Sequence, residues 1–238
     1  MGRSILVASG KGGAGRSTFA IAMGITLARQ DKKVCLLDLN FGLRNLDIYL
    51  GLEDKVIFDM GDIMAGVCKI EKAIIKHDRI EGLYLLESTQ NKMIKGISDI
   101  HIKALCAQLK NEFDYVIIDG PSAVSSELAL AASGADSAVL VFTPDPLSLR
   151  NGDAIDKRLS FWGVKSRCFV LNMVRNADDD SLLPKMDDFT SVLKIPFAGI
   201  IPYDENIHLG NCAGRSVFAV ENSYIARNME DIIRRMLG

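Results

Sequence analysis

Short, continuous apolar runs alternate with helical patterns along most of this chain. Residues 5–8 and 34–37 are entirely apolar, as expected for parallel strands that are covered on both faces. Between these two runs, apolar residues recur at helical spacing up to about residue 30. This order predicts a strand, a helix and a second strand, joined by a right-handed crossover.

The same alternation continues to the end of the chain. Further strands are predicted at residues 83–86, 115–118, 137–142, 168–172 and 198–201. Helices are predicted at residues 100–109, 127–132 and 223–237, with another that follows Asp145. Residues 56–76 also have a helical pattern, which Gly61 and Gly66 interrupt. We therefore expect an α/β fold, with a mostly parallel, twisted sheet of seven or eight strands and helices on both faces.

A glycine-rich stretch joins the first predicted strand to the first predicted helix. Its sequence is Gly10-Lys11-Gly12-Gly13-Ala14-Gly15-Arg16-Ser17-Thr18. This spacing fits the pattern G-x-x-x-x-G-K-[ST] except at Arg16, where the pattern has lysine. Successive glycines let backbone N–H groups turn toward one anion, and the following helix adds its positive end. The loop predicts a P-loop NTPase-type phosphate site, and the alternative is a turn that only connects a strand to a helix.

An acidic residue follows another apolar run. Asp119 comes directly after residues 115–118, so it should lie at the carboxyl edge of the sheet, beside the glycine loop. In P-loop proteins an aspartate in this position holds the Mg²⁺ shell, usually through water. Alternatively, Asp119 only begins the turn at Gly120-Pro121.

Two motifs resemble one known family. Lys11 makes the loop Lys-Gly-Gly-x-Gly, which resembles the deviant Walker A motif of the ParA/MinD family of nucleotide-dependent positioning ATPases. Residues 38–47, Asp-Leu-Asn-Phe-Gly-Leu-Arg-Asn-Leu-Asp, resemble the switch I segment of its MinD branch. The resemblance covers nearly the whole chain, and the alternative for residues 38–47 is an exposed loop with a short helix.

The resemblance implies a MinD-like protein that binds ATP or ADP with Mg²⁺ and forms an ATP-dependent homodimer. Lys11 would neutralise charge on the phosphates, often across the dimer, while Asn172 and Pro202 would frame the adenine. The implied nucleotide-binding residues are Gly10, Lys11, Gly12, Gly13, Ala14, Gly15, Arg16, Ser17, Thr18, Asn172 and Pro202. The implied catalytic residues are Lys11, Arg16, Asn40 and Asp119, and the implied metal-binding residues are Ser17 and Asp119.

Four residues depart from the family pattern, and all of them concern hydrolysis more than binding. Arg16 replaces the loop lysine, and its guanidinium is bulkier than an ammonium between phosphates. Asn40 replaces the second switch I aspartate, Ala123 replaces a glycine near the γ-phosphate, and Asn151 replaces an aspartate. We expect slow or partner-dependent hydrolysis in a switch that acts in spatial positioning, such as selection of the division site. A second hypothesis is an ATP-binding regulator that no longer hydrolyses ATP.

Composition bears on two further alternatives. A net charge of −2 argues against a ParA-like, DNA-associated partition ATPase, because nucleic-acid binding requires a concentrated basic surface. Five cysteines lie tens of residues apart without a C-x-x-C pair, which argues against an iron–sulfur relative. They are interpreted as buried thiols, and the three histidines as packing or surface residues. We expect the partner to be a protein activator or cargo rather than nucleic acid.

The chain is expected to form one domain, residues 1–238, without a separate targeting tail. Neither a secretory leader nor a bilayer-spanning run is expected, which predicts a cytoplasmic protein. The final helix has one apolar stripe, which predicts packing against the sheet. The alternative is that Arg227, Arg234 and Arg235 bring it to anionic lipid at the inner face of the membrane.

Overall fold

The computed structural model describes residues 1–90, 96–121, 125–175 and 186–238. Their strands form one eight-stranded sheet in the order β3-β4-β2-β5-β1-β6-β7-β8. All neighbouring strands are parallel except β3 and β4. The strands are β1 (Arg3–Ala8), β2 (Val34–Asp38), β3 (Ile75–Lys76), β4 (Leu83–Leu86), β5 (Tyr115–Asp119), β6 (Ser137–Phe142), β7 (Ser166–Val174) and β8 (Phe197–Pro202).

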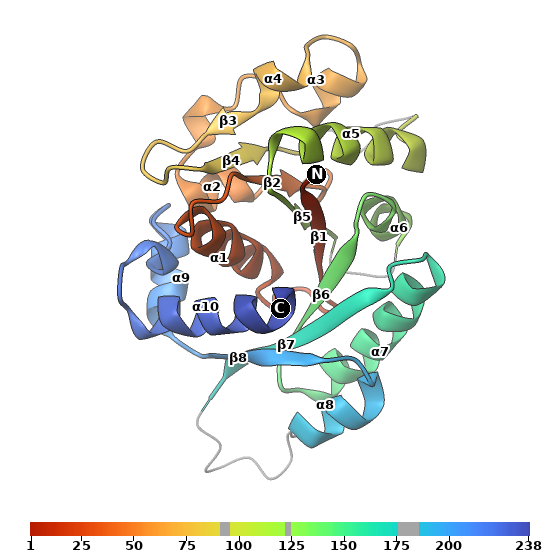
Figure 1. Cartoon of the computed structure of the whole chain (residues 1–238), viewed down its shortest axis with the longest axis vertical. Coiled ribbons are helices and arrows are strands. Elements are labelled where there is room, and N and C mark those ends of the chain that lie inside the picture. The colour runs from red at the N-terminus through yellow and green to blue at the C-terminus, as the bar shows by residue number, and fades with distance from the viewer. Residues whose placement is uncertain (91–95, 122–124, 176–185) are drawn as a thin grey trace.

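Helices cover both faces of this sheet (Figure 1). The α-helices are α1 (Arg16–Ala28), α2 (Leu46–Leu50), α3 (Met60–Met64), α4 (Ile70–Ala73), α5 (Asp99–Glu112), α6 (Ser126–Ser133), α7 (Pro146–Phe161), α8 (Met186–Leu193), α9 (Glu205–Cys212) and α10 (Tyr224–Leu237). Two 3₁₀ turns, η1 (Glu53–Lys55) and η2 (Val217–Ala219), complete the described elements. α1 and α10 lie on one face, and α5, α6, α7 and α8 lie on the other.

The central strand β1 separates two hydrophobic cores. Leu6 and Ala8 pack in the core that includes α5, α6 and α7, whereas Ile5 and Val7 pack in the core that includes α1 and α10. Successive side chains of a strand point to opposite faces, so a strand covered on both faces needs apolar residues at every position. This explains why residues 5–8 are continuously apolar.

The strand order places one edge of the sheet at a topological switch point. After β1 the chain moves to β2 on one side, and later it fills β6, β7 and β8 on the other side. Parallel pairing sets Val7 opposite Asp119, and Asp38 is paired with the same residue. The loop after β1 therefore begins beside two carboxylates, at the position where open α/β sheets bind ligands.

The predicted α/β class and the mostly parallel sheet are confirmed, with eight strands and helices on both faces. The prediction for residues 56–76 was partly wrong. Only Met60–Met64 and Ile70–Ala73 are α-helical, and Ile75–Lys76 pairs with β4 as an antiparallel edge strand. Gly66 has a φ of 71°, which ends the first helix, while pairing with β4 extends the end of this segment. Helices α8 and α9 were not predicted, because their apolar residues make only short patterns.

The C-terminal helix packs against the sheet, as its apolar stripe predicted. Ile225, Met229, Ile232 and Ile233 are buried between α10, α1 and the sheet, and Gly199 in β8 leaves room for Ile232. The apolar face is therefore used inside the protein, which argues against insertion of this face into a lipid surface. Among the described residues, no helix combines the length and apolar character needed to span a membrane.

A core substitution in α10 tests this packing. We expect Ile232→Ala to lower the free energy of unfolding by about 2–5 kcal/mol, because it removes buried contacts and leaves a cavity. Ile100→Ala is the matched control, since Ile100 is 71% exposed, and it should change stability by less than about 0.5 kcal/mol. Urea unfolding followed by circular dichroism measures both values, and equal effects would contradict the packing of α10.

Candidate functional site

The glycine loop between β1 and α1 is open toward one cavity. A Cβ atom at Gly12 or Gly13 would meet no atom within 4 Å, and Gly13 and Gly15 have φ values of 75° and 86°. These positive φ values require glycine and direct the loop backbone into α1. Within the described part of the chain, no side chain caps the N-terminus of this 13-residue helix. Its first N–H groups and its positive dipole end are therefore available to an anion.

Asparagine side chains from distant elements hold the loop in this shape. Asn151 Nδ2 in α7 donates to the carbonyl of Gly10 at 2.9 Å, and Asn172 Nδ2 in β7 donates to the carbonyl of Ala14 at 2.8 Å. A Cβ at Gly10 would come within 2.6 Å of Asn151 Cβ, so α7 packs directly on the loop. An aspartate at position 151 could not donate the bond to Gly10, which gives this departure from the family pattern a structural role.

The first turn of α1 meets the carboxylate at the end of β5. Arg16 Nε donates to Asp119 Oδ1 at 3.0 Å, and Ser17 Oγ donates to Asp119 Oδ2 at 2.5 Å. Asp119 is fully buried and Arg16 is 8% exposed. Burial raises the pKa of Asp119, while Arg16 and the Ser17 hydroxyl partly offset this effect. The structure thus places Asp119 beside the glycine loop, as the sequence predicted, and the contact of Arg16 with this carboxylate is a finding that the sequence did not predict.

Two more buried carboxyl groups, those of Asp38 and Glu87, lie at the same edge of the sheet as Asp119. Asp38 Oδ1 accepts a hydrogen bond from the backbone of Asn40 at 2.7 Å, and burial together with Asp119 raises the Asp38 pKa. Glu87 Oε1 accepts from the backbone of Asp47 at 2.7 Å, whereas Glu87 Oε2 has no hydrogen-bond partner among the described residues. Burial, reinforced by Asp38 and Asp47, raises the pKa of Glu87 to about 10. Glu87 is therefore protonated at neutral pH.

Sequence reasoning missed Glu87, although a signal was present. Glu87 follows directly after β4, so it lies at the same edge of the sheet as Asp38 and Asp119. Asn40 is not among the residues that line the cavity in the described chain, whereas Asn45 and Tyr49 line it. The catalytic role of Asn40 stays a prediction.

Lys11 forms an ion pair within its own chain. Its Nζ lies 2.9 Å from Asp145 Oδ2, and the Thr143 hydroxyl donates to the same oxygen at 2.5 Å. Asp145 also caps α7, because its Oδ1 accepts from the backbone of Ser148 at 2.9 Å. The lysine is thus held near the N-terminus of α7, and it is 38% exposed. Its action on a neighbouring copy stays a prediction.

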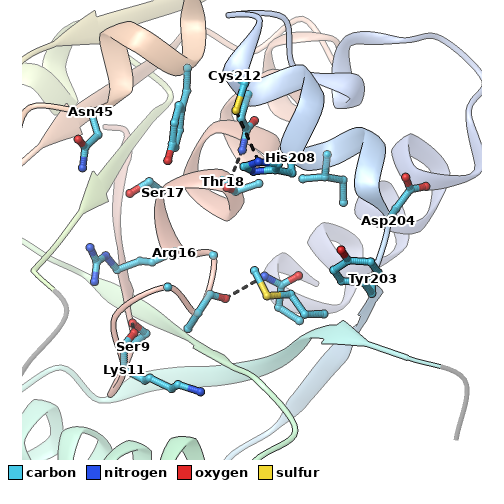
Figure 2. A pocket seen from close by; sticks show the side chains of 18 of the residues that line it. Ser9, Lys11, Arg16, Ser17, Thr18, Asn45, Tyr203, Asp204, His208 and Cys212 are labelled. Atoms are coloured by element: carbon cyan, nitrogen blue, oxygen red, sulfur yellow. Dashed lines mark hydrogen bonds between the residues drawn. The ribbon is translucent and has the colours of Figure 1, made fainter.

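The cavity beside the loop has a volume of about 330 Å³. Asn172, Pro202 and Tyr203 line it, together with His208 and Cys212 of α9. Figure 2 shows Tyr203, His208 and Cys212 around this cavity. The predicted adenine-framing residues therefore lie together next to the glycine loop. Their contact with a base stays a prediction.

A local distortion of β7 shapes this wall. Met173 has a φ of 58°, and the pairing of β7 with β8 shifts register between Leu171 and Val174. This left-handed residue follows Asn172, whose side chain reaches Ala14 in the glycine loop. Local strain of this kind is common at functional sites. The bulge was not visible in the sequence, because residues 168–172 have the pattern of an ordinary apolar strand.

Helix α9 contributes residues that sequence reasoning missed. Asn211 Nδ2 donates to Thr18 Oγ1 at 2.9 Å, which joins α9 to the first turn of α1. Cys212 is exposed, so the prediction of five buried thiols was wrong at this position. Its Sγ lies 3.7 Å from His208 Nε2. Cys35 and Cys106 are buried, whereas Cys68 and Cys168 are half-buried. A short helix with few apolar residues gave no signal that it would reach the cavity.

Two further predictions concern Ala123 and the binding of a metal ion. Ala123 lies outside the described residues. Within the described residues, no group of three or more histidine, cysteine, aspartate or glutamate side chains is arranged to hold a metal ion. A magnesium ion would accordingly need oxygen atoms from its nucleotide and from water as well.

His77 is buried, and its Nδ1 accepts hydrogen bonds from the backbone N–H groups of Arg79 and Ile80, as expected for a packing residue.

These features define a P-loop NTPase-type fold, with its site at the switch point of the sheet. A family model described as an AAA domain matches residues 2–159. The septum site-determining protein MinD of Synechocystis is 34% identical over all of this chain and 90% of its own length.

Solved structures agree with this relationship. A chain of the MinC:MinD cell division protein complex of Aquifex aeolicus has a TM-score of 0.89 at 29% identity, covering 99% of this chain and 96% of that one. The MinD of Pyrococcus horikoshii, complexed with Mg-ADP, has a TM-score of 0.86 at 25% identity, covering 98% of this chain and 94% of that one. The chain belongs to the MinD branch of the ParA/MinD family.

The buried Glu87 predicts a pH dependence of stability. Its raised pKa means that the folded state retains a proton that the unfolded chain has lost above pH 4.5. Stability should therefore fall as pH rises from 6 to 9, by at most about 1.4 kcal/mol per pH unit for this group. Glu87→Gln keeps a neutral acceptor and should reduce the loss. Urea unfolding at pH 6, 7.5 and 9 measures this loss, with Glu127→Gln as the exposed control. Identical slopes in all three proteins would contradict the assignment.

The asparagine bond to the loop gives a second prediction. Asn151→Asp should lower the free energy of unfolding by about 1–3 kcal/mol, because the Gly10 carbonyl loses its donor and faces a carboxylate. Asn111→Asp, at an exposed position near the end of α5, is the matched control and should have little effect. Thermal unfolding of both variants measures the difference, and an unchanged melting temperature in Asn151→Asp would show that the bond contributes nothing.

Proposed function

We propose that this chain is a Mg-ATP-dependent molecular switch of the MinD type, in which residues 1–238 act as one ATPase domain. The ATP form dimerises, presents a surface to a protein partner and takes part in spatial positioning, such as selection of a division site. Hydrolysis is slow or depends on that partner. The proposal includes ATP and ADP as alternative ligands of one site, with Mg²⁺ as the metal.

One observation carries this proposal. The uncapped N-terminus of α1 and the open backbone at Gly13 face a cavity of about 330 Å³. Backbone N–H groups at such a helix end bind a phosphate chain, and the cavity next to them has room for a nucleoside. Pro202 and Tyr203 supply apolar surface to that cavity. A polyphosphate with an attached base matches this combination.

The oxygen atoms beside the loop suit magnesium. Ser17 Oγ and Asp119 Oδ2 lie within 2.5 Å of each other, and hard oxygen donors are those that Mg²⁺ prefers. When bound, the ion would neutralise negative charge on the phosphate oxygens. Ser17 would bind the ion directly, and Asp119 would accept hydrogen bonds from its water shell.

The remaining residues divide binding from hydrolysis. Backbone groups of residues 12–17 bind ground state and transition state alike, so they support affinity. Lys11 would leave Asp145 and stabilise charge that develops on the phosphates of a neighbouring copy. Arg16 and Asn40, which depart from the family, supply weaker support for the transition state. This division explains how tight binding and slow turnover can coexist.

The relatives indicate the kind of partner. The Aquifex structure contains MinC together with MinD, and we propose that this chain likewise binds a protein partner in its triphosphate form. We propose that its first partner is a second copy of the same chain, with which it forms a homodimer. The overall charge of −2 does not favour nucleic acid.

A second candidate function is an ATP-binding regulator without turnover. The observation that favours it is the bond from Arg16 to Asp119, because this guanidinium points at a carboxylate in place of a phosphate. Phosphate release by the wild type and Arg16→Lys separates the two functions. No release by the wild type, with release restored by lysine, would support the regulator and overturn the ATPase.

Sizing by light scattering tests the switch. We expect a monomer with ADP and a dimer with ATP or a non-hydrolysable analogue, because only the triphosphate lets Lys11 bridge two copies. Lys11→Ala should stay monomeric in every state, yet bind ADP within about threefold of the wild type, since backbone groups supply most ground-state contacts. Isothermal calorimetry measures binding, with Lys157→Ala as an exposed control. Failure to bind either nucleotide at micromolar levels would overturn the proposed function.

A further inference from the structure

Arg16 engages a carboxylate where the phosphate loop pattern has a lysine. The residue begins α1, and its side chain leaves the helix on the same side as Ser17 (Figure 2). Its Nε donates to Asp119 Oδ1 at 3.0 Å, while Ser17 Oγ donates to Asp119 Oδ2 at 2.5 Å. The first turn of α1 therefore binds both oxygens of one buried carboxylate.

This carboxylate lies in a strongly acidic surrounding. Asp119 is paired in register with Asp38 on the neighbouring strand, and both residues are fully buried. Two buried carboxylates repel each other, and a buried charge without a partner is costly. The side chain of Arg16 is 9% exposed and its Nε lies 3.0 Å from Asp119 Oδ1, so it supplies positive charge directly to Asp119. A divalent cation bound near Ser17 and Asp119 would supply charge to the same carboxylate.

Arginine suits this role better than lysine. Its guanidinium is planar and stays charged, and it can donate through Nε while its other nitrogens face elsewhere. A lysine ammonium is a compact point charge without the Nε donor that Arg16 uses. A lysine at this position would consequently leave Asp119 more dependent on a separate cation.

We propose that Arg16 replaces part of the electrostatic contribution of magnesium at Asp119, so that ADP binds to this chain with a weakened dependence on the metal. The inference rests on the proposed nucleotide site and deepens it. It gives Arg16 a positioning and charge-compensating role in place of the phosphate contact expected from its place in the motif.

The experiment measures ADP affinity by isothermal calorimetry in excess Mg²⁺ and in EDTA. For the wild type we expect the two dissociation constants to agree within about threefold. For Arg16→Lys and Arg16→Gln we expect the EDTA value to exceed the Mg²⁺ value by about tenfold or more, because Asp119 then lacks its guanidinium partner. Comparing ratios removes any general change in affinity that a substitution causes.

Arg167→Lys is the matched control. Arg167 Nε also donates to a carboxylate, Asp156 Oδ1, at 2.6 Å, but this pair joins β7 to α7 outside the cavity lining. Its ratio should equal that of the wild type. Thermal unfolding of each variant checks that it is folded before titration.

The outcomes separate the two proposals. Unchanged ratios in both Arg16 variants, with ADP still bound, would overturn the role of Arg16 and leave the nucleotide site intact. If both Arg16 variants fail to fold, the wild type alone decides, because a wild-type ratio above about tenfold is incompatible with the proposal. ADP that binds under neither condition would instead overturn the proposed function itself.

Discussion

Parallel pairing of β1 with β5 and β6 is the constraint on which the site depends. It buries β1 on both faces and sets Val7 opposite Asp119, so the loop that leaves β1 begins beside that carboxylate. The same edge receives Asp38 from β2 and Glu87 from the end of β4. One hydrogen-bonding pattern therefore assembles a phosphate loop and three acidic residues from four strands.

Concentrating carboxylates at this edge carries an electrostatic cost, which the protein compensates in three ways. Arg16 supplies a positive charge to Asp119, and burial holds Glu87 in its neutral form. Arg44 pairs with Asp47, at 2.6 Å, beside the same group. Removing one partner from a buried ion pair typically costs about 3–5 kcal/mol, so these pairings constrain which substitutions the site can accept.

Long-range side-chain bonds shape the site as strongly as the loop sequence does. Asn151, Asn172 and Asn211 come from α7, β7 and α9, and each donates to the glycine loop or to the first turn of α1. They join three elements that follow β6 in the chain to one short segment. A shift of any of these elements would therefore change the position of the loop, which suits a protein whose proposed role is to switch between two states.

The sequence by itself determined the α/β class, the parallel sheet and the position of the glycine loop, because buried parallel strands require continuous apolar runs and a phosphate loop requires glycines. It also predicted that Asp119 lies beside the glycine loop that contains Arg16 and Ser17, since this aspartate ends a strand and the loop begins a helix. Only the tertiary structure decided that Arg16 turns to Asp119, that Lys11 pairs with Asp145, and that Glu87 and Asn211 belong to the site. Sequence patterns specify local periodicity, whereas these contacts join residues 40 to 193 positions apart through packing that no local pattern encodes.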